Sequence, residues 1–216
     1  MELNEQQLTD LQQELNYAVK YKETYDELYD HILTEIGTYP EQPFYATTAA
    51  KQIIDNEFGG YEALKQMEKD RVKLVTAVMR KKHLQHMLRF FNFPVAASTL
   101  IITIAAYFAA QNPVGRNYLI QITTGCAVVP MLFLLYKKLS AKYKQWKWNV
   151  YKKQSIKDNY IFIAALLSNS TFNLLIIENR KLLINGGIAM LVFAIYMVYV
   201  LSFFKLYRDE FKMQLT

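Results

Sequence analysis

Residues 182–204 read LLINGGIAMLVFAIYMVYVLSFF, a run of 23 residues that contains no charged side chain. A helix of this length crosses the hydrocarbon core of a membrane, which is roughly 30 Å thick. Three further stretches of about the same length also lack charge: 90–110, 118–136 and 160–177. The sequence therefore predicts an all-α protein in which a small N-terminal helical domain precedes a bundle of four transmembrane helices.

The charge of the chain is divided between two parts. Residues 1–70 contain 15 Asp and Glu but only 5 Lys and Arg, whereas residues 71–216 contain 4 acidic and 20 basic residues. The net charge of +6 and the mean hydropathy of zero average over these two parts. We expect an acidic domain (1–70), a basic juxtamembrane helix (71–89), the transmembrane part (90–204) with a basic loop (137–159), and a tail (205–216).

The positive charges also predict the topology. Six Lys and Arg lie in 71–89, directly before the first apolar stretch, eight lie in the loop 137–159, and three follow the last stretch. The loop between the first two apolar stretches carries one Lys or Arg, and the loop between the last two carries two. Because cytoplasmic loops are enriched in Lys and Arg, both termini are predicted to be cytoplasmic. The polar, acidic start of the chain lacks the apolar segment of a secretory signal, and the single Cys126 excludes an intrachain disulfide.

The acidic domain shows the pattern of short amphipathic helices. Asn4 and Gln7 form a possible capping box ahead of the first helix. Apolar residues then recur with helical spacing over 25–36, and Pro40 and Pro43 predict a loop at 38–44. A third helix is expected over 45–57, ended by Gly59-Gly60. A fourth begins near Tyr61 and meets no further Gly or Pro before Pro94, so it is expected to continue toward the membrane.

Three short motifs carry a resemblance to a known family. They are YDELYDHI at 25–32, AAKQII at 49–54 and EFGGYEAL at 57–64. Together they resemble the permease prefix or HAAS-type domain, a small helical domain that precedes membrane segments in many bacterial proteins, and Bacteroidota members of this size are the most similar. The loop 38–44 departs from the family's acidic, Gly-containing stretch. The resemblance implies a signalling or interaction module on a bacterial inner-membrane protein, and it brings no catalytic residues.

Five polar residues crowd the second predicted helix and are candidates for binding a partner protein: Asp26, Glu27, Asp30, His31 and Glu35. The alternatives are a solvated acidic face and a metal site. Spacing of i, i+4 pairs Asp26 with Asp30 and Glu27 with His31. Because ligands from one helix alone rarely complete a metal site, we predict no metal here. His83 and His86 lack a carboxylate nearby in the sequence and are expected to be surface groups near lipid headgroups.

The basic loop 137–159 combines lysines with a face formed by Leu139, Tyr143, Trp146 and Val150. One interpretation is an amphipathic helix on anionic lipid; the other is that the flanking transmembrane helices extend into the cytoplasm. Nucleic-acid binding is not predicted, because membrane attachment already accounts for the charge. The candidate headgroup-binding residues are Lys137, Lys138, Lys142, Lys144, Lys147, Trp146, Trp148, Lys152 and Lys153.

Small and polar residues interrupt the last two apolar stretches. Such residues allow close approach and hydrogen bonding between helices in lipid. A polar path for a substrate is the alternative. The candidate packing residues are Ser168, Asn169, Thr171, Asn173, Asn185, Gly186 and Gly187.

No Asp, Glu, Lys, Arg or His lies within the four stretches, and no cofactor or catalytic motif is present. We expect a non-enzymatic, multi-pass inner-membrane protein without a cofactor, which acts as an interaction, regulatory or accessory subunit. Its partners would be anionic lipids and either another protein or further copies of itself. One alternative is a small transporter for a neutral or lipidic substrate. The other is a lipid-acting enzyme, for which the cytoplasmic face offers only His83, His86, Asp158, Asp209 and Glu210. Whether the acidic domain binds the lysine-rich loop stays open.

Overall fold

The computed structural model describes residues 3–38, 45–148, 153–178 and 185–212. Over these residues the chain is helical, apart from turns, caps and an isolated parallel bridge between Tyr21 and Gln154. The prediction of an all-α protein is therefore confirmed. The chain divides into two units, and each is described separately below. The first comprises 1–77 and 150–159, and the second 78–149 and 160–216.

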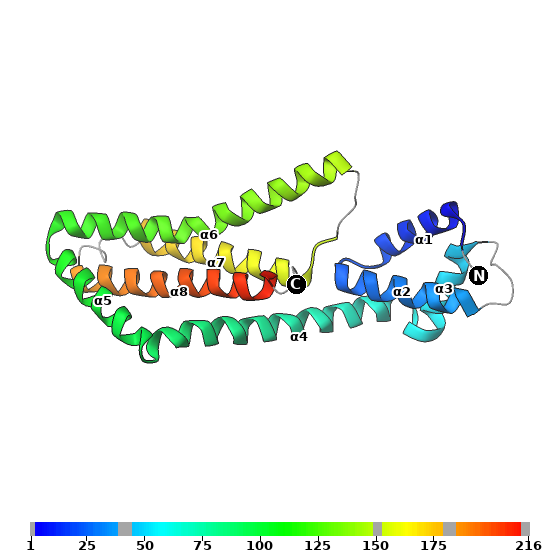
Figure 1. Cartoon of the computed structure of the whole chain (residues 1–216), viewed down its shortest axis with the longest axis horizontal. Coiled ribbons are helices and arrows are strands. Elements are labelled where there is room, and N and C mark those ends of the chain that lie inside the picture. The colour runs from blue at the N-terminus through cyan, green and yellow to red at the C-terminus, as the bar shows by residue number, and fades with distance from the viewer. Residues whose placement is uncertain (1–2, 39–44, 149–152, 179–184, 213–216) are drawn as a thin grey trace. The chain divides into compact units, whose positions relative to one another are not determined.

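The first unit is built on three short helices, α1 (Glu5–Ala18), α2 (Lys22–Thr38) and α3 (Ala46–Phe58), which contact one another (Figure 1). Asn4 caps α1, and the reciprocal bonds between Asn4 and Gln7 confirm the capping box. Apolar residues of the three helices form the core of this unit, together with one residue of the next helix: Leu11, Leu15, Leu28, Ile32, Ile36, Ala49, Ile53, Ile54 and Leu64.

Gly59 ends α3 with a φ of +74°, a left-handed conformation that favours glycine. The next helix, α4 (Gly60–Leu88), begins at once and runs for 29 residues without a break, as the sequence predicts. The division between the two units falls inside α4, between residues 77 and 78. Helix α4 therefore contributes residues to both units.

The second unit contains the rest of α4, the 3₁₀ helix η1 (Arg89–Phe91) and three long helices: α5 (Val95–Gln111), α6 (Pro113–Trp148) and α8 (Gly186–Lys212). Helix α7 (Ile156–Glu178) starts in the first unit and continues in the second. The first apolar stretch was expected to be helical from residue 90. Instead, η1 and a turn precede α5, and Pro94 lies at its N-cap, where the missing N–H is not needed.

Helices α5 and α6 both pack against α8. Helix α6 contains Pro130 in its interior, and Figure 1 shows that α6 changes direction along its length. Proline removes one backbone hydrogen bond and commonly bends a helix. Gly186, one of the predicted packing residues, lies at the start of α8. A Cβ atom added there would lie 2.7 Å from the carbonyl oxygen of Ala110 in α5, so this approach requires glycine.

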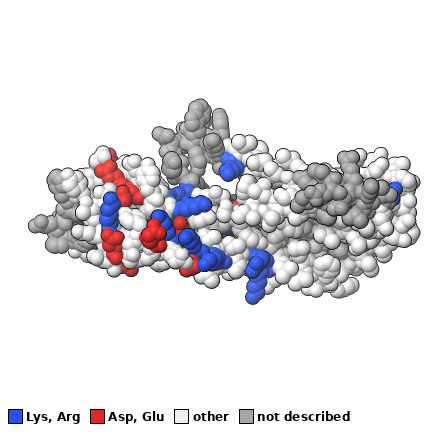
Figure 2. Space-filling view, turned by 180° about the vertical axis from the view of Figure 1, so that it is seen from behind, with Lys and Arg blue, Asp and Glu red and all other residues white. Residues whose placement is uncertain are grey.

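Two helices are long and apolar enough to cross a membrane, by length and composition: Pro113–Ser140 of α6 and Gly186–Phe211 of α8. A third crossing results if Gly60–Phe91 and Val95–Gln111, which are bent by 73°, form one broken span. On the face drawn in Figure 2, charged side chains gather over the first unit and are sparse over the apolar helices of the second. These features indicate a membrane protein. A bundle of four crossings stays a prediction.

Candidate functional site: a clasp at the start of α7

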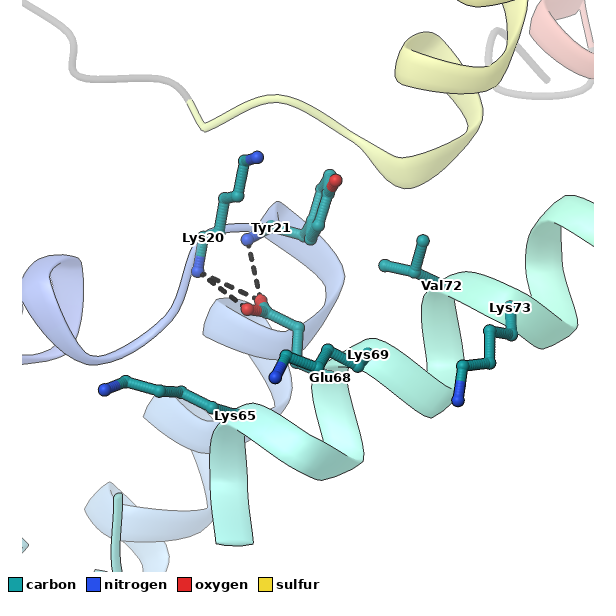
Figure 3. Close-up of a pocket in the computed structure, with 7 residues that line it drawn as sticks. All are labelled: Lys20, Tyr21, Lys65, Glu68, Lys69, Val72 and Lys73. Atoms are coloured by element: carbon teal, nitrogen blue, oxygen red, sulfur yellow. Dashed lines mark hydrogen bonds between the residues drawn. The ribbon is translucent and has the colours of Figure 1, made fainter. Parts of the chain in front are cut away.

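The connection between α1 and α2 carries two backbone N–H groups that no helix satisfies. We call Val19–Glu23 the elbow. Val19 is extended and ends α1, and α2 begins at Lys22, so Lys20 and Tyr21 lie between the two helices. Glu68 of α4 accepts hydrogen bonds from both, at 3.0 Å from Lys20 N and 2.9 Å from Tyr21 N (Figure 3). Glu68 is only 8% exposed, and these bonds compensate for burying its charge.

Lys153 supplies the opposite charge. Its Nζ donates to the carbonyl oxygens of Asn16, at 3.0 Å, and of Val19. These carbonyls lie at the C-terminal end of α1, where the helix dipole favours a cation. Burial lowers the pKa of Lys153, and the Glu68 carboxylate opposes that shift. The structure thus places Lys153, a predicted lipid ligand, inside the first unit among protein groups.

The residues that follow Lys153 continue the contact. The carbonyl oxygen of Gln154 accepts a hydrogen bond of 3.2 Å from Lys22 N. The Ser155 hydroxyl donates to Glu23, and the backbone N of Ile156 lies 3.2 Å from both carboxylate oxygens of Glu23. Glu23 therefore caps the first turn of α7, where a carboxylate is stabilised by the helix dipole. We call this set of contacts between the elbow, Glu68 and residues 153–156 the clasp.

A hollow of about 450 Å³ lies beside the clasp. Figure 3 shows its lysine side chains pointing in different directions. Two of them pair at 2.8 Å with carboxylates of their own helix, Lys65 with Glu62 and Lys73 with Asp70. The ammonium groups do not converge on one point, so the hollow has no arrangement for gripping a single anion. Its lining residues are Lys20, Tyr21, Lys65, Glu68, Lys69, Val72 and Lys73.

Side chains of the predicted partner-binding site on α2 form ion pairs with residues of different helices. Asp26 lies 3.5 Å from Lys22, and Glu27 lies 2.5 Å from Arg71 of α4. His31 lies 2.5 Å from Glu57 of α3. His31, Glu35 and Glu57 present ligand atoms within 4.8 Å of one another. Reading the second helix alone missed Glu57, because the contact depends on how α2 and α3 pack.

The predicted headgroup-binding lysines fall in different surroundings. Lys137 of α6 donates to the Tyr207 hydroxyl, and its Nζ lies 4.7 Å from the centre of that ring. Lys138 lies 5.1 Å from the Phe162 ring. Helix α6 continues through Trp148, as expected if a transmembrane helix extends beyond the apolar stretch. The side chains of Lys142, Lys144, Trp146, Lys147, Trp148 and Lys152 lie outside the part that the structure describes.

Several predicted packing residues contact neighbouring helices. Thr171 Oγ1 of α7 lies 3.0 Å from the Tyr196 hydroxyl of α8, and Asn169 Nδ2 lies 3.5 Å from the Met131 sulfur of α6. Ser168 is buried, and its hydroxyl has no partner among the described residues. Asn185 caps α8 by accepting from Gly187 N at 2.9 Å. The side chain of Asn173 lies outside the described residues.

The two histidines of α4 meet α8 within the second unit. Buried His83 lies 3.1 Å from Ser202 Oγ, and that hydroxyl donates to the Tyr199 carbonyl at 2.7 Å. Because the Ser202 hydroxyl donates to that carbonyl, its oxygen is able to accept a hydrogen bond from the His83 ring. His86 lies 3.6 Å from Asp209. Sequence reasoning missed this carboxylate partner because α8 is more than 100 residues away along the chain.

Among the described residues, some of those considered as catalytic groups of a lipid-acting enzyme contact one another, and others do not. His86 meets Asp209, and Glu210 pairs with Lys82. Asp158 lies in the first turn of α7, within the first unit. Comparison with family models, with curated proteins and with solved structures found no match for this chain.

Proposed function

We propose that this chain is a non-enzymatic, multi-pass protein of the bacterial inner membrane that works as an interaction or regulatory subunit. The N-terminal helical domain, which resembles the permease prefix family, would bind a protein partner in the cytoplasm. The clasp supports this proposal most directly. Through it, the residues that begin α7 belong to the same unit as the N-terminal helices.

The clasp gives the domain a physical means of acting on an apolar helix. Glu23 caps α7, so any change in the elbow changes how the first turn of α7 is held. Glu68 is a buried charged group and Lys153 is half-buried, and the bonds of the clasp offset the cost of removing both from water. A partner that binds the domain in one arrangement of the clasp more tightly than in another would shift α7 between two states.

The membrane topology in this proposal has four crossings with both termini in the cytoplasm. The distribution of Lys and Arg over the loops supports it. The two apolar helices, α6 and α8, support attachment to a membrane. In this arrangement the acidic domain and the start of α7 would share the cytoplasmic side, where the clasp requires them to be.

The test is a pull-down of the full-length protein from native membranes in mild detergent. We expect a stoichiometric protein partner to copurify with the wild type. The double variant Asp26→Asn with Asp30→Asn should lose it, because both side chains belong to the predicted partner site on α2. The control variant Glu5→Gln with Asp10→Asn removes the same number of negative charges from α1 and should still copurify with the partner. A pure, partner-free oligomer that supports uptake of a neutral solute into liposomes would overturn the proposal.

A further inference from the structure

We propose that His31, Glu35 and Glu57 bind a divalent transition-metal ion, Zn²⁺ in the first instance. The three side chains come from two helices of the first unit, His31 and Glu35 from α2 and Glu57 from α3. Each offers one ligand atom, and these atoms lie within 4.8 Å of one another. None of the three takes part in the clasp, so the inference does not depend on the proposed function.

The donor set matches the chemistry of zinc. Zn²⁺ accepts imidazole nitrogen and carboxylate oxygen at about 2.0 to 2.2 Å, and three protein ligands with one water form a common tetrahedral site. Neighbouring ligands of such a site lie about 3.4 Å apart. His31 Nε2 and Glu57 Oε2 are 2.5 Å apart and would separate slightly on binding. Both side chains are about 40% exposed or less, so they are free enough to adjust and leave room for water.

The backbone already fixes the directions of the ligands. Residues 31 and 35 are four apart in α2, so their side chains lie on one face. Glu57 lies in the last turn of α3, and the ring of the next residue, Phe58, contacts the His31 ring edge-on at 5.5 Å. This contact orients the imidazole toward α3. The packing of α3 on α2 thus supplies the ligand from a second helix that α2 alone lacks.

The charge of the surroundings also favours a cation. The segment 1–70 holds 15 acidic and 5 basic residues. An ion pair between His31 and Glu57 explains why these two side chains lie together, but it does not explain why the Glu35 carboxylate lies beside them. Two carboxylates at one site would balance the charge of Zn²⁺, and the bound ion would remove the repulsion between them.

The experiment is calorimetric titration of ZnCl₂ into the detergent-purified full-length chain, carrying an affinity tag without histidine. We expect one saturable site per chain. Glu35→Gln and Glu57→Gln should each weaken binding by more than about 100-fold, since even residues behind the ligands contribute about 10- to 100-fold. The matched control Glu62→Gln changes a solvated carboxylate of α4 and should bind as the wild type does.

Cobalt provides a second readout that does not depend on affinity. Co²⁺ at this site should give the intense visible absorption of a four-coordinate ion, and Glu35→Gln should abolish it. Circular dichroism establishes that each variant is folded. Wild-type binding by Glu35→Gln would overturn the proposal, because it would reduce the cluster to the His31–Glu57 ion pair. Absence of saturable binding, or binding removed only by replacing His83 or His86, would overturn it too.

Discussion

At the scale of single residues, Glu68 has the largest predicted effect on stability. Glu68→Ala would leave the N–H groups of Lys20 and Tyr21 without their acceptor and Lys153 without the carboxylate that favours its charge. We expect the free energy of unfolding of the first unit to fall by about 2–4 kcal/mol. Hydrogen exchange measured by mass spectrometry should show faster exchange over 16–23 and 153–157. Glu62→Ala, on the exposed side of α4, should change neither the free energy of unfolding nor the exchange over these residues.

Because His83 is buried, we expect the stability of the folded chain to depend on pH. Burial is the main cause that lowers the pKa of His83 to about 4, and nearby His86 acts in the same direction. In the unfolded chain the pKa is about 6.5. The folded state therefore disfavours the protonated ring, and the stability due to neutral His83 is complete above pH 6.5 and is lost as the pH falls toward 4.

Thermal unfolding of the full-length chain should show this loss between about pH 7 and pH 5.5, where carboxylates remain ionised. His83→Gln, which keeps a donor toward Ser202, should flatten the slope in that range. His31→Gln on the half-exposed surface of α2 serves as the matched control and should leave the slope contributed by His83 in place. An identical slope in the wild type and His83→Gln would show that other groups cause the dependence.

At the scale of helices, the approach of α8 to α5 predicts opposite effects for two glycines. Gly186→Ala would place a Cβ atom 2.7 Å from the Ala110 carbonyl oxygen and should destabilise the second unit by about 1–3 kcal/mol. Gly125 lies inside α6, where an added Cβ atom would meet no atom within 4 Å among the described residues. Gly125→Ala should stabilise α6 by up to about 1 kcal/mol. Melting temperatures in detergent should move in opposite directions.

The helices themselves were largely predictable from the sequence because their signals are local. The Asn4–Gln7 capping box, the turn at Gly59 and the unbroken course of α4 each depend on residues within a few positions. The site was much less predictable. The clasp joins positions more than 130 residues apart, and Glu57 reaches His31 only through packing of α3 on α2. No local pattern specifies such contacts, whose partners depend on tertiary packing.

At the scale of the whole molecule, the predicted topology can be tested by cysteine labelling. In a Cys126→Ser background, Asn117→Cys is exposed in the first turns of α6 and lies between the first two apolar stretches, a segment expected outside. Tyr17→Cys, at 82% exposure, lies in the domain expected inside. A maleimide that does not cross membranes should label Asn117→Cys in intact spheroplasts. It should label Tyr17→Cys only after permeabilisation. Labelling of Tyr17→Cys in intact spheroplasts would contradict the four-crossing topology.

The clasp also has a consequence for the order of synthesis. Glu23 leaves the ribosome 133 residues ahead of Ile156, the residue whose backbone it caps. At about 5–20 residues per second, the N-terminal helices wait roughly 7–27 s for the segment that completes them. Helices α5 and α6 are made in the second part of this interval, before the elbow can gain its contacts with residues 153–156. The nascent N-terminal domain is therefore finished only after the first half of the apolar region exists, which ties its maturation to membrane insertion.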